Sequence, residues 1–298
     1  MAIWRKCGDE HGAALTYHQL GTTAEAQRNF VAAENWYQQA LVILEKYGDE
    51  HNAAVTYHQL GRIAEEQRNF AVAERRHQQA LAISQKYGDE ILAARIYHQL
   101  GLIAGERGDF AAAENWYKQA LVIWERYGNE HDAGFVYHQL GIIAQRQQNF
   151  EAADKYYQKS LTIKERLGDE YSTASTYHQL GNVALMRREF ALAEQWYRKS
   201  LAIKEKHGNA HGAAITYGQL GVLAGLQDHF VESGRWMIRA IVGFTHQHDS
   251  QSIEGNAHRI AHNFLILHHQ VSPDEQAQLR QMWEGAGLGP FPEDGNPP

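Results

Sequence analysis

One five-residue stretch, YHQLG, recurs along this chain of 298 residues at a constant step of forty. Five copies begin at Tyr17, Tyr57, Tyr97, Tyr137 and Tyr177, and a sixth, YGQLG, begins at Tyr217. A fixed period of this length is typical of repeat proteins, in which each unit contacts mainly its neighbours. The repeat therefore predicts one elongated array rather than the two ordinary domains that the length alone would suggest.

Each repeat has the spacing of two helices. In residues 49–88 the first half carries apolar or small residues at Ala53, Tyr57, Leu60, Gly61 and Ala64. The second half carries them at Phe70, Ala73, His77, Ala80, Leu81 and Ile83. Steps of three and four indicate helices rather than strands, so the unit is expected to hold two helices of about seventeen residues joined at Arg68-Asn69.

Short polar signals mark the ends of these helices. A glycine followed by Asp or Asn stands at Gly48-Asp49, Gly88-Asp89, Gly128-Asn129, Gly168-Asp169 and Gly208-Asn209. Glycine ends a helix in the left-handed conformation, and Asp or Asn begins the next by accepting from its free amides. Glycine and alanine also recur in register, which predicts close approach of neighbouring helices, and no proline occurs before Pro273.

The repeat resembles the tetratricopeptide repeat (TPR) family. The residues that carry the resemblance are Tyr17, Leu20-Gly21, Ala24, Phe30, Ala33, Tyr37 and Ala40. The usual period is about 34 residues, and this forty-residue form resembles Pins-type polarity adaptors and the repeat arrays of bacterial STAND-type NTPases and CHAT proteases. The resemblance implies an all-α fold: an α-solenoid of TPR helical hairpins that forms a right-handed superhelix.

The pattern divides the chain into four segments. Residues 1–8 match the end of a second helix, so the array is expected to begin inside a repeat. Residues 9–247 form six forty-residue units. Residues 248–284 are predicted to hold a degenerate seventh helix and a capping helix, which Ser272-Pro273-Asp274-Glu275 begins as a capping box. Residues 285–298, rich in glycine and proline, are predicted to be a flexible tail.

Charge, cysteine content and apolar runs limit the kinds of partner that the chain is expected to bind. The net charge is −7, and acidic and basic residues are interspersed. The sequence therefore has no basic stripe of the kind that nucleic-acid binding needs, and no nucleic-acid partner is expected. Cys7 is the single cysteine, which excludes an intrachain disulfide. The sequence has neither a signal peptide at its start nor an apolar run of membrane-spanning length. These features predict a cytoplasmic protein with no membrane partner.

The chain carries no motif for catalysis. Phosphate-binding GxxxxGK[ST] and GxGxxG loops are missing, as is a nucleophile elbow. We therefore expect no enzyme activity and no cofactor. Glu254, His258 and His262 stand four residues apart on one predicted helix face, a spacing that can chelate a metal. No cysteine or second motif supports that reading, and a solvated or capping face is preferred, so no metal site is predicted.

The histidines of YHQLG form a ladder of His18, His58, His98, His138 and His178. Neighbouring helices lie about 8–10 Å apart, which is too far for successive rungs to share one metal ion. Two readings remain open. The histidines and glutamines either form hydrogen bonds between repeats, which we prefer, or face a ligand.

In the TPR family the first helices of the repeats line a concave groove that binds ligand. The resemblance places charged residues of this groove in the early repeats and apolar ones later. The expected ligand-binding residues are Arg62, Glu66, Arg95, Leu102, Phe135, His138, Ile142, His178, Asn182, Leu185, Met186 and Val222. The alternative is that the long helices bury some of them. The family's carboxylate clamp needs Lys where this chain has His, so an acidic chaperone tail is not the expected ligand.

These observations predict a non-catalytic scaffold or sensor that holds a protein or peptide ligand in the groove. The alternative is a self-assembly module of a larger bacterial signalling or defence protein. In that case the open half-repeat at the N-terminus, with Ile3 and Trp4, would form a homo-oligomer by stacking on a second copy.

Overall fold

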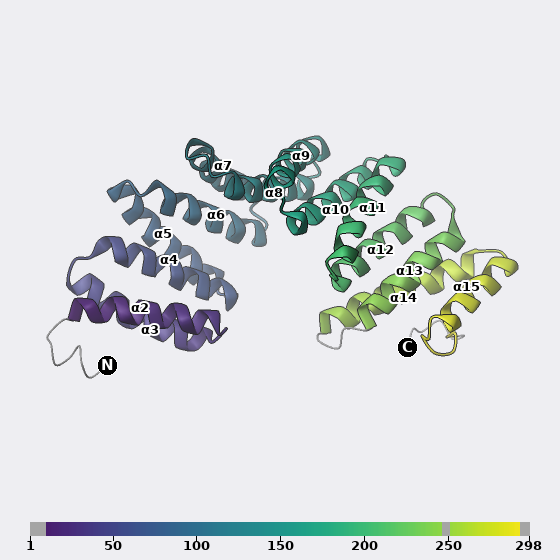
Figure 1. Cartoon of the computed structure of the whole chain (residues 1–298), viewed down its shortest axis with the longest axis horizontal. Coiled ribbons are helices and arrows are strands. Elements are labelled where there is room, and N and C mark those ends of the chain that lie inside the picture. Colours follow the sequence, from purple (N-terminus) through teal and green to yellow (C-terminus); the bar gives the residue numbers. More distant parts are fainter. Residues whose placement is uncertain (1–9, 246–250, 293–298) are drawn as a thin grey trace. The chain divides into compact units, whose positions relative to one another are not determined.

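The computed structural model describes residues 10–245 and 251–292, and every regular element in these ranges is an α-helix. The prediction of an all-α array of helical hairpins is confirmed. The chain forms two compact units, Met1–Gln147 and Gln148–Pro298, which are described separately (Figure 1).

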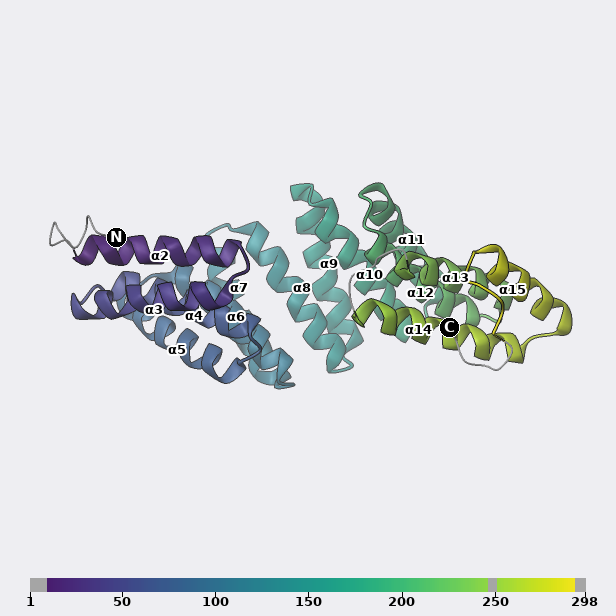
Figure 2. The same cartoon turned by 90° about the horizontal axis from the view of Figure 1, so that it is seen from below.

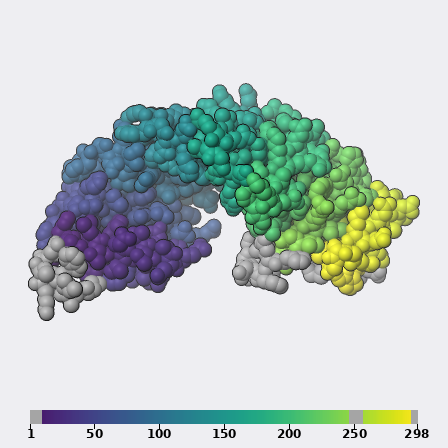
Figure 3. Space-filling model, viewed as in Figure 1, coloured from purple at the N-terminus to yellow at the C-terminus, as the bar shows by residue number. Residues whose placement is uncertain are grey.

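Residues 10–147 of unit 1 hold seven helices. They are α2 (Glu10–Ala26), α3 (Phe30–Lys46), α4 (Glu50–Glu66), α5 (Phe70–Tyr87), α6 (Glu90–Glu106), α7 (Phe110–Arg126) and α8 (Glu130–Arg146). Helices α2 and α3, α4 and α5, and α6 and α7 pack as hairpins, and the second helix of each also contacts the first helix that follows (Figures 1 and 2). The atoms of consecutive hairpins lie directly against one another, from purple to teal in Figure 3.

Unit 2 continues the same pattern and ends in a different one. Its helices are α9 (Phe150–Leu167), α10 (Glu170–Met186), α11 (Phe190–Lys206), α12 (Ala210–Gly225), α13 (Phe230–Thr245), α14 (Gln251–Gln270) and α15 (Pro273–Gly285). Helices α10 and α11, and α12 and α13, form hairpins, whereas α14 and α15 both pack against α13.

The predicted helix ends are confirmed. The side chain of Asp49 accepts a hydrogen bond from the amide of Asn52 at 3.2 Å, and that of Asp169 accepts from Ser172 at 3.0 Å. Gly88 has a φ of 69°, the left-handed conformation that the end of α5 requires. Because each cap satisfies amides or carbonyls that the helix leaves free, hairpin follows hairpin with short turns.

The glycine of YHQLG lies where the two helices of a hairpin approach most closely. A Cβ atom added to Gly101 would stand 2.6 Å from Cε1 of Tyr117, and one added to Gly181 would stand 2.5 Å from Cε1 of Tyr197. Both tyrosines are fully buried, at 1% and 0% exposed. The glycine therefore makes room for a buried ring from its partner helix.

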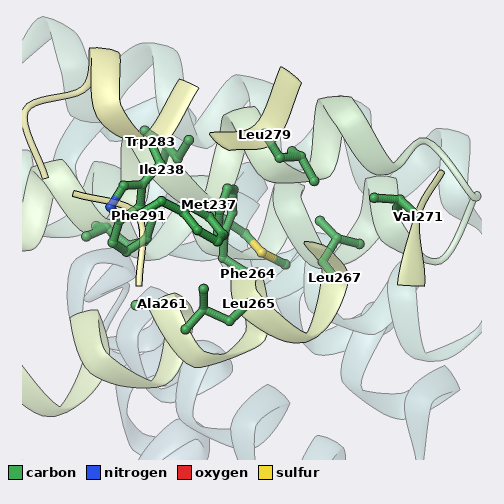
Figure 4. Close-up of a cluster of buried hydrophobic side chains, with 11 residues drawn as sticks. Met237, Ile238, Ala261, Phe264, Leu265, Leu267, Val271, Leu279, Trp283 and Phe291 are labelled. Atoms are coloured by element: carbon green, nitrogen blue, oxygen red, sulfur yellow. The ribbon is translucent and has the colours of Figure 1, made fainter. Parts of the chain in front are cut away.

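An apolar cluster closes the C-terminal end of unit 2. Leu279 and Trp283 of α15 are buried with Met237 of α13 and Phe264 of α14, and Figure 4 shows these side chains coming together. The capping box at Ser272 begins α15 as predicted.

The tail departs from its prediction. Phe291, six residues past the end of α15, is 7% exposed and belongs to the same cluster. Within the segment that was predicted to be flexible, residues 285–298, the ring of Phe291 is thus packed against the fold, because burying an aromatic ring away from water is favourable. The residues predicted to stack on a second copy, Ile3 and Trp4, lie outside the described residues, as do residues 293–298.

Candidate functional site

Unit 1 contains a hollow of about 600 Å³, formed chiefly by α4, α6 and α8, each of which is the first helix of its repeat. The side chains that line it come from the same face of each helix, at steps of three and four. They are Val55, His58, Gln59 and Arg62 from α4; Asp89, Ile91, Leu92, Arg95, His98 and Gln99 from or next to α6; Trp124 from α7; and His131, Asp132, Phe135 and Val136 from α8.

Three of the predicted ligand-binding residues meet in this hollow. Arg62, Arg95 and Phe135 line it together. Four more predicted residues belong to unit 1 without lining the hollow: Glu66, Leu102, His138 and Ile142. The hollow thus brings together only part of the predicted groove.

The remaining five predicted residues lie in unit 2. Met186 and Val222 are 57% and 39% exposed, as a binding surface requires. His178 and Asn182 are engaged inside the unit: His178 contacts Thr216, and Asn182 accepts a hydrogen bond from the hydroxyl of Tyr197 at 2.8 Å.

Leu185 is a core residue rather than a ligand-binding one. It is 7% exposed and packs in a cluster with Tyr197. Its position in the repeat faces the second helix of the same hairpin, since the equivalent Glu25 accepts from the hydroxyl of Tyr37 at 2.9 Å and Glu65 lies 2.5 Å from His77. The assignment of Leu185 to the binding surface is therefore wrong, because the long helices bury this position.

Two histidines of the ladder join successive repeats through a threonine. Nδ1 of His18 lies 3.1 Å from the hydroxyl of Thr56, and Nδ1 of His178 lies 3.2 Å from that of Thr216. Each threonine stands 38 residues after its histidine, directly before the next tyrosine. At His18 and His178 the structure therefore supports a hydrogen-bonded joint between successive repeats rather than contact with a ligand.

The joint is interrupted beside the hollow. The positions that would hold the partners of His58 and His98 are Ile96 and Val136, which are 0% and 1% exposed and have no hydroxyl. His58 lies instead 3.3 Å from Nδ1 of His77. Nε2 of His98 is buried and has no hydrogen-bond partner among the described residues.

Burial keeps these histidines neutral. Desolvation, followed by the charges of His77, Arg62 and Arg95, lowers the pKa of His58 to about 3. Burial also lowers the pKa of His98, against a smaller upward effect of Asp132. At neutral pH His58 and His98 therefore add no positive charge to the hollow, whereas Arg62 and Arg95 do.

The two arginines differ in their surroundings. Arg62 is paired with Glu25 at 2.9 Å and donates to Oε1 of Gln59 at 3.1 Å. Arg95 is exposed, and within the described part of the chain it has no hydrogen bond or ion pair. The neighbouring carboxylates are occupied, since Asp89 accepts from the amide of Leu92 at 3.0 Å and Asp132 accepts from Nδ2 of Asn129 at 2.8 Å.

The hollow also holds a glutamine without a partner. Oε1 of Gln99 is buried and accepts no hydrogen bond from the described residues. Sequence analysis did not single out Trp124, and it named His98 and Gln99 only as members of the repeated YHQLG motif, with contact to a ligand as the less preferred reading. A signal for His98 and Gln99 was present, because the residue before the repeated tyrosine is threonine at 16, 56, 176 and 216 but Ile96 and Val136 in the third and fourth copies.

The two roles of the ladder lead to a prediction. His178→Ala removes the contact with Thr216, whereas His98→Ala removes an unpartnered nitrogen. Each loses a similar ring contact, with Tyr197 at 5.5 Å or Tyr117 at 5.7 Å. We expect His178→Ala to lower the free energy of unfolding by about 1 kcal/mol more than His98→Ala. Thermal unfolding followed by circular dichroism measures the difference, and equal losses would contradict it.

The described residues hold no cluster of three or more His, Cys, Asp or Glu placed to bind a metal ion. Glu254, one of the three residues weighed as a chelating set, has a side chain outside the described ones. None of the helices in the described ranges has the length and apolar character to cross a membrane.

The chain belongs to the tetratricopeptide repeat family. The family model matches residues 12–86, 52–126, 92–166 and 132–206, which together run over most of the six units. The resemblance seen in the sequence is thereby confirmed. No match to a curated protein sequence is found.

Solved structures share the fold at low sequence identity. A signal transduction ATPase with numerous domains (STAND) from Pyrococcus horikoshii, with a tetratricopeptide repeat sensor, superposes with a TM-score of 0.72 at 16% identity, covering 93% of this chain and 42% of that one. Aspartyl phosphate phosphatase F from Bacillus subtilis gives 0.70 at 14% identity, covering 96% and 73%. The Rap conjugation gene regulator of plasmid pLS20, in complex with the Phr* peptide, gives 0.58 at 17% identity, covering 91% and 72%.

Proposed function

We propose that this tetratricopeptide repeat scaffold binds a peptide segment of a partner protein in the hollow of unit 1, without catalysis of its own. The observation that carries the proposal is the lining of the hollow. It combines apolar side chains with Nε2 of His98 and Oε1 of Gln99, which find no hydrogen-bond partner among the described residues. Ligand sites in proteins have this mixture, in which apolar surface supplies affinity and a few polar groups fix orientation.

A peptide suits the hollow better than a compact small molecule. The lining residues repeat from α4 to α6 to α8, so the chemical groups follow one another at the spacing of the repeat. An extended or helical segment can present side chains at such intervals. One structure of the same fold, the Rap regulator of plasmid pLS20, was solved with the Phr* peptide, which supports this class of ligand.

A sensor role in a larger signalling protein is a finer form of the same proposal. The STAND protein from Pyrococcus horikoshii is described as having a tetratricopeptide repeat sensor, and only 42% of it is covered by this chain. In such an arrangement the peptide bound here would be the signal, and the response would come from another segment.

Selection from a phage-displayed library of random peptides on the full chain tests the site. Phe135, which is half-buried in the hollow and contacts the ring of His131 at 4.8 Å, is the variant position. We expect Phe135→Glu to weaken the selected peptides by about 2 kcal/mol or more, because a charge would replace an apolar anchor. Fluorescence polarisation of a labelled peptide gives the dissociation constants.

Met186→Glu is the matched control. Met186 is 57% exposed on unit 2 and is a sequence-predicted binding residue outside the hollow. It should leave the affinity within about twofold of the parent if the site is in unit 1. Should Phe135→Glu lower the melting temperature, Val55→Glu on α4 replaces it. Peptides that bind both hollow variants as tightly as the parent would refute the site, and loss on Met186→Glu alone would move it to unit 2.

A further inference from the structure

We infer that the hollow of unit 1 recognises a segment that carries a single carboxylate, with Arg95 as the residue that binds it. This inference rests on the proposed function and names the chemistry of the ligand. The hollow holds two arginines, a buried glutamine oxygen and a buried histidine nitrogen, and only some of these groups are satisfied by the fold.

The first step is the charge that remains free. Arg62 is neutralised by Glu25 at 2.9 Å, so its guanidinium has a partner before any ligand arrives. Arg95 has no ion pair within the described part of the chain. A guanidinium presents a planar set of donors that matches a carboxylate, and such charge-assisted pairs are stronger than neutral hydrogen bonds. Arg95 is therefore the group available to an anion.

The second step is the number of charges. Asp89 and Asp132 also line the hollow, and their carboxylates serve as helix-cap partners on α6 and α8. One free arginine beside two carboxylates suits a ligand with one negative charge. A phosphate dianion would be repelled by Asp89 and Asp132 more strongly than a carboxylate, while among the described residues of the lining Arg95 would still be the one arginine without an ion pair.

The third step is the pair of buried atoms beside Arg95 on α6. Oε1 of Gln99 and Nε2 of His98 have no partners among the described residues, so the free protein carries the cost of two desolvated polar atoms. A peptide backbone offers N–H and C=O groups that would satisfy such atoms. The carboxylate is thus expected to belong to a chain with amides next to it, rather than to a free inorganic anion.

The interruption of the histidine–threonine contact lies in the same part of unit 1 as these atoms. At the other joints that lie within one unit, a threonine hydroxyl meets the histidine. Ile96 and Val136 remove that hydroxyl beside His58 and His98. His58, His98 and Val136 line the hollow, so the missing threonine hydroxyls and the unsatisfied atoms lie in the same part of unit 1.

Two small peptides of matched shape test the inference on the full chain. The probes are acetyl-Leu-Glu-Leu-amide and acetyl-Leu-Gln-Leu-amide, which differ only by the carboxylate, together with inorganic phosphate. Titration followed by the Nε–Hε cross-peaks of the arginines and the backbone amides of α6 and α8 gives each affinity. At pH 7 and low salt, we expect the Glu peptide to bind about tenfold more tightly than the Gln peptide.

Arg95→Gln should abolish this preference, whereas Arg107→Gln should retain it. Arg107 is the matched control because it is exposed near the end of α6 and is paired with Glu74 at 2.6 Å, outside the hollow. Arg95 is exposed as well, so both variants should have the melting temperature of the parent protein.

The outcomes separate this inference from the proposed function. If both peptides bind the hollow equally, the carboxylate inference is overturned and peptide binding stands. A Glu preference that survives Arg95→Gln overturns the role of Arg95, and phosphate binding tighter than that of the Glu peptide overturns the choice of ligand. If neither peptide shifts any signal of the hollow, the carboxylate inference is overturned, and the library selection alone decides the proposed function.

Discussion

Gly101→Leu should destabilise unit 1 by about 3 kcal/mol or more, because the added side chain has no space in the α6–α7 hairpin. Even a single Cβ atom at Gly101 would stand 2.6 Å from Cε1 and 2.7 Å from Cδ1 of Tyr117. The ring cannot move aside easily, since Tyr117 is 1% exposed. Urea unfolding followed by circular dichroism measures the loss.

Two controls distinguish the close contact from a general effect of size. Ala82→Leu places the same side chain on an exposed position of α5 and should change the unfolding free energy by no more than about 0.5 kcal/mol. Gly221→Ala should cost less than Gly101→Ala, because its added Cβ stands 2.9 Å from Cγ of Met237 and 3.3 Å from the backbone oxygen of Ser233, whereas at Gly101 three ring atoms of Tyr117 lie within 2.9 Å. A Gly101→Leu protein with the parent's midpoint would show that α6 and α7 are not in close contact.

Much of the fold could be predicted because helix periodicity, helix caps and close-packing glycines depend on residues near one another in the sequence. The steps of three and four give helices of 17 residues in α4 and 18 in α5, close to the predicted length. The Gly-Asp pairs mark turns because each cap is a contact within a few residues. The glycine of YHQLG signals close helix packing through its size alone, and the six copies repeat these signals.

The site was predicted less well, because its chemistry depends on residues far apart in the sequence. The contact between His18 and Thr56 spans 38 residues, and only the structure shows that a hydroxyl completes the joint. Leu185 was assigned to the binding surface from family positions, but the long helices of this form bury it against the second helix of the hairpin. Arg62, Arg95 and Phe135 were assigned to the same surface and do line one hollow.

Lys204 in unit 2 occupies a position of the repeat that holds Leu44, Trp124 and Phe244 in three other copies, and Ser84 and Lys164 in the remaining two. Lys204 of α11 is 8% exposed, while the equivalent residues Leu44 and Phe244 are both 1% exposed. Its Nζ donates a hydrogen bond to the hydroxyl of Thr216 at 2.8 Å, and no carboxylate of the described residues forms an ion pair with it. Burial lowers the pKa of Lys204 to about 8.

A buried cation of this kind makes stability depend on pH. Below pH 8 the amine is protonated in both the folded and the unfolded protein, so the folded protein carries the full cost of the buried charge. Between pH 8 and the ordinary lysine value of 10.5, the unfolded chain keeps a proton that the folded protein has released. Stability contributed by this group therefore rises with pH across that window.

Lys204→Met should accordingly stabilise the protein at pH 7 by about 2 kcal/mol. The lowering of the Lys204 pKa from 10.5 to about 8 corresponds to a destabilisation of the folded protein by about 3 kcal/mol. The variant also loses the hydrogen bond to Thr216, which reduces its gain by about 1 kcal/mol. The Thr216 hydroxyl keeps its hydrogen bond to the carbonyl of Gly212 at 3.0 Å, so it is not left unsatisfied. Urea unfolding at several pH values gives the advantage of the variant over the parent.

That advantage should be constant below pH 8 and should shrink as the pH approaches 10.5, because the parent then folds with a neutral amine. Lys206→Met is the control: Lys206 is exposed and paired with Glu170 at 2.6 Å, so its removal should change stability by no more than about 1 kcal/mol. If Lys204→Met is less stable than the parent at pH 7, the amine reaches water in the folded protein. A pH-independent advantage would show instead that the gain comes from packing and not from the buried charge.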